Sequence, residues 1–159
     1  MAKVLVVYDS ESGNTEKMAV AVAEGVKQVK NVDVTVKKVK QASLDDLCTS
    51  DGIIMGSPTY YGQMSGELKT FIDRSVKIHG KLEGKVGAAF TSSGGTATGA
   101  ETTLLAILET MLVHGMIVQG RSDDKHFGSA AVGPPHPKEI EHCKELGRRV
   151  AHLVLKLGE

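Results

Sequence analysis

Apolar and polar positions alternate along the chain in a way that predicts strands separated by helices. Four segments are almost continuously apolar, which is typical of strands buried on both faces of a parallel sheet. These segments are Lys3–Tyr8, Ile53–Met55, Val86–Phe90 and Met116–Val118. A fifth segment, Val32–Val36, alternates apolar and polar residues with a period of two, which indicates a half-exposed strand at a sheet edge.

Between these segments, apolar residues recur at intervals of three and four, the spacing that places them on one face of a helix. The four stripes are Met18, Val22, Val26 and Val29; Met64, Leu68, Phe71 and Ile72; Leu104, Leu105, Leu108, Met111 and Leu112; and Ile140, Cys143, Val150, Leu153, Val154 and Leu157. A further short helix is expected to begin at Ser43. The segment Gln119–Pro137 is rich in Gly and Pro and is expected to be a long loop.

Five strands that alternate with helices predict a parallel sheet with helices on both faces, the doubly wound α/β arrangement. With Val32–Val36 at the edge, the strand order 2-1-3-4-5 fits. The length of 159 residues suits one domain, and no internal repeat or linker is visible, so residues 1–159 are expected to form a single domain. Ligands of such sheets bind beyond the C-terminal strand ends, where the loops after the first, third and fourth strands meet.

The loop after the first strand has the composition of an anion-binding helix start. It consists of Ser10, Glu11, Ser12, Gly13, Asn14 and Thr15. The first turn of a helix offers unpaired backbone N–H groups and the positive end of the helix dipole. The loop contains no Lys or Arg and lacks the Lys of a G-x-x-x-x-G-K-[ST] loop, which favours one terminal phosphate over a magnesium-bound polyphosphate. The alternative is that these residues only cap the helix.

The loops after the third and fourth strands add aromatic and polar groups. The first of the two contains Pro58, Thr59, Tyr60, Tyr61 and Gly62, and the second contains Thr91, Ser92, Ser93, Gly94, Gly95 and Thr96. A tyrosine in such a loop can stack on a flat ring, and small residues with free donors suit the polar edge of a heterocycle. The three loops together predict a pocket for a phosphorylated flat cofactor. The alternatives are tyrosines that pack on a neighbouring helix or subunit, and a glycine loop that is only flexible.

The charge balance and the cysteine and histidine patterns argue against several other functions. Lys and Arg number 19, as do Asp and Glu, so no nucleic-acid partner is expected. The two cysteines form no C-x-x-C pair and the six histidines no metal-binding pattern, so no metal site is expected. Neither a hydrolase triad nor the phospho-acceptor Asp of a receiver module is present. Without a visible signal peptide or membrane-spanning segment, a cytoplasmic protein with no membrane partner is expected.

Several motifs resemble those of known flavoproteins. Ser10–Thr15 resembles the phosphate loop of flavodoxins, which bind FMN. Gly56–Gly66 is similar to the G-T-P-T-R-F-G-N-M-S-G stretch of NAD(P)H:quinone oxidoreductases of the tryptophan-repressor-binding-protein (WrbA) type. Phe90–Gly94 and His114–Met116 are also similar to that branch, and the likeness covers nearly the whole chain. The resemblance implies a flavodoxin-like fold with FMN as the cofactor, held by the three loops.

Two functions follow from this resemblance. Lys40–Asp51 and His79–Lys85 are shorter than in the quinone oxidoreductases, where longer segments help to build a tetramer and a nicotinamide or quinone site between subunits. The short segments favour a low-potential one-electron carrier that serves a redox partner protein. The alternative is an enzyme that passes two electrons from NAD(P)H to a quinone, with His114 near the flavin as a catalytic residue. His114 could instead cap a helix C-terminus. A homodimer is compatible with both functions.

Overall fold

Strands and helices alternate along most of the chain, and the computed structural model describes all 159 residues. The strands are β1 (Ala2–Tyr8), β2 (Val32–Lys38), β3 (Gly52–Pro58), β4 (Val86–Ser93), β5 (Ile117–Val118) and β6 (Ser129–Val132). The α-helices are α1 (Asn14–Lys27), α2 (Leu44–Cys48), α3 (Gly66–Arg74), α4 (Ala100–Val113) and α5 (Pro137–Leu157), and two short 3-10 helices are η1 (Val39–Gln41) and η2 (Ser75–Ile78). None of the helices combines the length and apolar character needed to cross a membrane.

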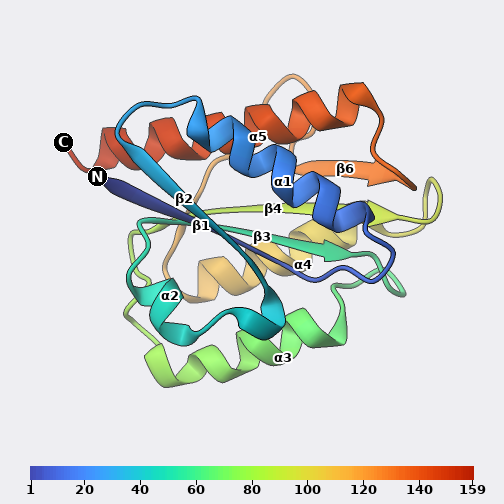
Figure 1. Cartoon of the computed structure of the whole chain (residues 1–159). Coiled ribbons are helices and arrows are strands. Elements are labelled where there is room, and N and C mark those ends of the chain that lie inside the picture. Colours follow the sequence, from blue (N-terminus) through green and yellow to red (C-terminus); the bar gives the residue numbers. More distant parts are fainter.

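The sheet is parallel throughout, and its neighbours run β2-β1-β3-β4-β5, which confirms the predicted strand order. Helices lie on both of its faces (Figure 1). β2 is the edge strand, and about half of its residues are exposed, as the alternating pattern predicts. β3 and β4 lie inside the sheet and are buried almost throughout. The C-terminal ends of β1, β3 and β4 therefore meet at one edge of the sheet.

The place of the fifth strand is shared by two segments, which corrects the prediction that Gln119–Pro137 is only a loop. β5 pairs with Val86 and Gly87 at the start of β4, whereas β6 pairs with Phe90–Ser93 at its end. Residues 119–128 leave the sheet between them. Ser129–Val132 consists of small residues without a clear apolar period, so its strand conformation depends on the free edge of β4 rather than on a local preference.

Two apolar cores lie on the two faces of the sheet. Successive side chains of a strand point to opposite faces, so β1 supplies both cores: Val4 and Val6 face α1 and α5, and Leu5 and Val7 face α3 and α4. α1 and α5 lie side by side over one face, and α3 and α4 cover the other (Figure 1). This double covering leaves the loop-bearing edges of the sheet as the places where polar groups can gather.

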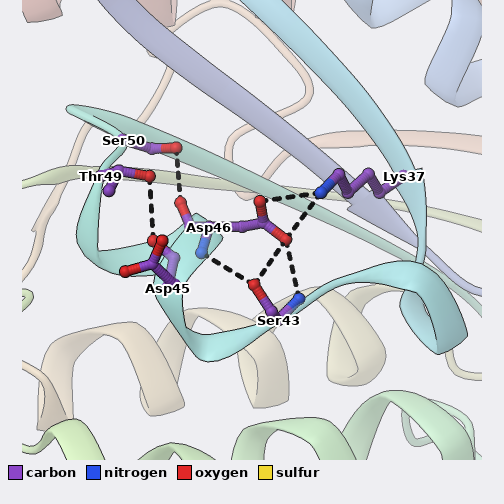
Figure 2. Close-up of polar contacts among 6 residues, drawn as sticks. All are labelled: Lys37, Ser43, Asp45, Asp46, Thr49 and Ser50. Atoms are coloured by element: carbon purple, nitrogen blue, oxygen red, sulfur yellow. Dashed lines mark hydrogen bonds and ion pairs between the residues drawn. The ribbon is translucent and has the colours of Figure 1, made fainter.

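A polar network holds the short helix α2 against the edge strand β2 (Figure 2). Lys37 Nζ donates to both carboxylate oxygens of Asp46, at 2.8 and 2.9 Å. The N–H and the hydroxyl of Ser43 donate to the same carboxylate, and the Ser43 hydroxyl accepts from the Asp46 N–H. Desolvation raises the pKa of Asp46, but the hydrogen bonds from Lys37 and Ser43 outweigh it and hold the pKa below the ordinary value. The predicted helix start at Ser43 is thereby confirmed.

Candidate functional site

The start of α1 is capped by the side chain of Ser10, which lies outside the helix. The N-cap residue is Gly13, which is in the left-handed conformation with φ of 92° and has no side chain to act as a cap. Ser10 Oγ instead accepts hydrogen bonds from the N–H groups of Gly13 and Glu16, at 3.2 and 3.3 Å. Glycine suits the N-cap position because a left-handed φ is strained for other residues. Ser10–Thr15 therefore form the turn into a helix that the sequence predicts.

The remaining N–H groups of this turn have no acceptor. The backbone N–H groups of Ser12, Asn14 and Thr15 donate to no atom of the protein. They lie at the positive end of the 14-residue helix α1. The nearby carboxylate of Glu16 faces Lys38 at 3.8 Å. A group of neutral, unpartnered donors at a helix start fits a small anion such as a phosphate ester.

Residues Tyr60–Gln63 form a tight turn beyond β3. The Tyr60 N–H donates to the Gln63 carbonyl at 2.9 Å, and the Gln63 N–H donates to the Tyr60 carbonyl at 3.0 Å. Both central residues have a positive φ, 52° at Tyr61 and 73° at Gly62, as in a type I′ turn. The Tyr61 side chain is fully exposed, and the N–H groups of Tyr61 and Gly62 have no acceptor. The turn thus presents an aromatic ring and two free donors.

Tyr60 connects this turn to the first loop. Desolvation raises the pKa of Tyr60, and the negative charge of Glu11 raises it further. The Asp9 N–H donates to the Gly56 carbonyl of β3 at 3.0 Å. The loops after β1 and β3 therefore lie side by side, as the strand order predicts.

Thr91, Ser92 and Ser93 belong to β4 rather than to a loop, which corrects the sequence-based prediction. Their side chains are buried. The run of apolar residues ends at Phe90. The strand nevertheless continues, because β3 pairs with the end of β4 on one side and β6 pairs with it on the other. Pro58 likewise forms the last residue of β3. Backbone pairing on both sides keeps these polar residues in the sheet.

The buried hydroxyl groups join the three segments. Thr15 Oγ1 lies 2.8 Å from Ser92 Oγ. Thr59 Oγ1 lies 2.8 Å from Thr91 Oγ1, which also donates to the Ser57 carbonyl at 2.7 Å. Ser57 also belongs to this network, and its signals in the sequence are its place at the end of an apolar run and within the Gly56–Gly66 motif. These hydrogen bonds connect the first turn of α1 with the ends of β3 and β4.

The third loop begins at Gly94. The backbone N–H groups from Gly94 to Thr98 have no acceptor in the protein. Ser93 Oγ and Thr98 Oγ1 donate to the Gly95 carbonyl at 2.9 and 2.8 Å and so shape the loop. Gly94 and Thr96 are exposed. The structure therefore brings three sets of unpartnered donors to one edge of the sheet.

His114 does not lie at this edge. α4 connects the end of β4 to the start of β5, and its 14 residues extend roughly 20 Å along the sheet before His114 caps its C-terminus. His114 Nε2 lies 2.7 Å from Ser75 Oγ. Desolvation, and to a smaller extent His79, lowers the pKa of His114. Of the two roles that the sequence left open for His114, the structure shows the helix C-cap, and a crossover helix ends at the opposite edge of the sheet from the three loops of the same chain.

The sequence and the fold of this chain are similar to those of known proteins. A family model described as NADPH-dependent FMN reductase matches residues 41–123. A flavodoxin of Aquifex aeolicus is 39% identical over 97% of this chain and 88% of its own length. An NAD(P)H dehydrogenase (quinone) of Sinorhizobium fredii is 42% identical over 100% of both chains. The solved structure of a flavodoxin from the domain Archaea has a TM-score of 0.80 and 35% identity over 96% of this chain and 99% of its own. The chain therefore belongs to the flavodoxin-like family of redox flavoproteins.

Proposed function

We propose that this protein binds FMN at the loops after β1, β3 and β4 and passes single electrons to and from a redox partner protein. The observation that carries the proposal is the set of unpartnered N–H groups of Ser12, Asn14 and Thr15 at the start of α1. The family implies a flavin. A helix start with free donors suits the phosphate of FMN, which riboflavin lacks.

The first loop holds the phosphate through hydrogen bonds rather than through cations. A hydrogen bond to a charged group contributes about 1.5–3 kcal/mol, and the helix dipole adds up to about 1 kcal/mol. Three backbone donors can therefore anchor the phosphate although the loop contains no Lys or Arg. Thr15 Oγ1 lies 2.8 Å from Ser92 Oγ, so when Ser92 donates to Thr15, the Thr15 proton is left for a phosphate oxygen.

The second and third loops hold the ring system. The exposed side chain of Tyr61 offers a stacking surface. The unpartnered N–H groups of Gly94, Gly95 and Thr96 offer donors for the carbonyl and nitrogen edge of the ring. FMN supplies the redox chemistry when bound, and the protein controls its orientation and potential.

Two observations favour a carrier over an enzyme. The alignment with the Sinorhizobium fredii protein spans 200 residues, whereas this chain has 159, so that relative contains segments that this chain lacks. The alignment with the Aquifex aeolicus flavodoxin spans only 162 residues. In addition, His114 caps α4 away from the three loops, so it cannot protonate a substrate bound at them within the same chain.

A quinone oxidoreductase is the second candidate. The observation that favours it is the 42% identity to an NAD(P)H dehydrogenase (quinone) over the full length of both chains. In this function, NAD(P)H would deliver a hydride and a quinone would receive two electrons. His114 could then act only from a second copy of the chain, so a catalytic role for His114 requires a homodimer or a larger assembly.

Titration of the ligand-free protein with FMN and with riboflavin tests the cofactor. We expect saturable FMN binding at least about 100-fold tighter than riboflavin binding, because two or more charged hydrogen bonds are lost with the phosphate. Quenching of flavin fluorescence measures both affinities. Equal affinities, or no uptake of FMN, would contradict the proposal.

Stopped-flow mixing of the FMN-loaded protein with NADH and NADPH distinguishes the two functions. A carrier is expected to react slowly with both nucleotides and to exchange electrons rapidly with a one-electron donor such as reduced methyl viologen. Fast direct reduction by either nucleotide, followed by fast reoxidation with a quinone, would make the carrier assignment wrong.

A further inference from the structure

The start of α4 contacts the Tyr60–Gln63 turn through a hydrogen bond and through the backbone. Thr102 Oγ1 donates to the Gly62 carbonyl at 2.7 Å. The backbones also touch, because a Cβ atom placed on Gly99 would lie 2.4 Å from Gly62 Cα. Gly99 is the N-cap of α4 and has a φ of 107°, so both the contact and the conformation suit glycine. The position of the turn therefore depends on α4 as well as on β3.

The Thr102 proton is committed to the Gly62 carbonyl. Thr102 Oγ1 also lies 3.0 Å from the Gly99 carbonyl. That oxygen already accepts from the N–H and the hydroxyl of Thr103, at 3.0 and 2.9 Å. Because a carbonyl oxygen has two lone pairs, the free acceptor within reach of Thr102 is Gly62.

We propose, on the basis of the proposed function, that Thr102 is a positioning residue for the flavin. It holds the carbonyl of Gly62, and with it the Gly62–Gln63 peptide, and so keeps in place the turn whose unpartnered N–H groups of Tyr61 and Gly62 flank the proposed ring site. Hydrogen bonds to the ring are a means by which a protein adjusts a cofactor's potential. Thr102 thereby contributes to the separation of the two one-electron midpoint potentials without touching FMN.

The test compares three variants of the full chain. Thr102→Val removes the hydroxyl, and Thr102→Ser keeps it and should rescue the effect. Thr110→Val is the matched control, because Thr110 lies in the same helix and its hydroxyl donates only to the Ile107 carbonyl, at 2.7 Å. The first readout is amide hydrogen exchange at Tyr60 and Gln63 in the ligand-free protein, and the second is the pair of midpoint potentials in the FMN-loaded protein.

We expect Thr102→Val to raise the exchange rates of the turn about two- to tenfold, which corresponds to the loss of one ordinary hydrogen bond. The equilibrium constant that relates the two electron-uptake steps should change by a similar factor. Thr102→Ser should restore both quantities, and Thr110→Val should change neither.

Each contrary result overturns a defined part of the proposal. Parent-like exchange in Thr102→Val, or a change that Thr102→Ser does not reverse, overturns the support of the turn by the hydroxyl. Faster exchange with unchanged potentials overturns the redox role. Failure of the parent protein to bind FMN overturns the proposed function and the redox role together, whereas the exchange rates still decide whether Thr102 holds the turn.

Discussion

The hydroxyl groups of Thr15 and Ser92 lie 2.8 Å apart, although 77 positions separate the two residues in the chain. Thr15 belongs to the first turn of α1 and Ser92 to the end of β4, and both side chains are buried. The pair connects the proposed phosphate-binding turn directly to the strand that carries the third loop. A buried polar contact therefore adds to the apolar packing between α1 and β4 in fixing two parts of the site relative to each other.

Removing both hydroxyl groups of this pair should destabilise the protein by less than the sum of the two single removals. Thr15→Val and Ser92→Ala each leave one buried hydroxyl without its partner, so each is expected to lower the free energy of unfolding by about 1–3 kcal/mol. The double variant should lose less than the sum of the two. Urea denaturation of the four proteins measures the coupling. Strict additivity would show that the two hydroxyls do not interact.

A negative charge in the first turn of α1 should have opposite effects on stability and on FMN affinity. Asn14→Asp is expected to stabilise the ligand-free protein by about 0.3–1 kcal/mol through the helix dipole. The same charge repels a phosphate and should weaken FMN binding about tenfold while leaving riboflavin almost unaffected. Asn31→Asp, the same change beyond the other end of α1, is the control. Equal weakening of both flavins by Asn14→Asp would place the phosphate elsewhere.

The contact between Lys37 and Asp46 should make the free energy of unfolding depend on pH in the acidic range. The folded pKa of Asp46 lies below its ordinary 3.8, so its contribution is fully present above that value and is lost as the pH falls through the lowered pKa. Asp46→Asn should cost about 1–2 kcal/mol at neutral pH, and its deficit relative to the parent should shrink below pH 3.8. Chemical denaturation of the parent and of Asp46→Asn at several pH values measures this difference in the free energy of unfolding.

Asp45→Asn is the control for this prediction. Asp45 lies in the same helix turn as Asp46, but its carboxylate makes none of the contacts that hold Asp46 (Figure 2). A deficit of Asp46→Asn that stays constant down to strongly acidic pH would show that the ionised carboxylate does not contribute to stability.

The close approach of α5 to α1 should not tolerate an added methyl group. A Cβ atom on Gly147 would lie 2.1 Å from the Val22 carbonyl oxygen. Gly147→Ala is therefore expected to lower the free energy of unfolding by about 1–3 kcal/mol, although alanine favours a helix. Gly158→Ala, where the nearest atoms are 3.5 Å away, is the control in the same segment. A variant at Gly147 as stable as the parent would show that the two helices can separate without cost.

Local patterns were sufficient for most of the fold. The continuous apolar runs of β1, β3 and β4 and the alternation in β2 express how many faces of each strand are buried. This burial places β2 at an edge, and the order 2-1-3-4-5 of doubly wound sheets fits that placement. The turn from Ser10 to Thr15 could be predicted for the same reason: a helix start is built from neighbouring residues, so its cap and its free N–H groups depend only on the local sequence.

The remaining features depend on contacts between distant segments. β6 and the polar end of β4 are strands because each finds a pairing partner, and backbone pairing is nearly independent of side-chain identity. His114 lies away from the three loops because α4 runs along the sheet to its opposite edge. Thr102 reaches Gly62 because the same helix begins beside the Tyr60–Gln63 turn. The sequence by itself thus determined most of the elements, the strand order and the composition of the proposed cofactor loops. Only the tertiary structure decided which residues touch at the site, because such contacts join residues that no local period relates.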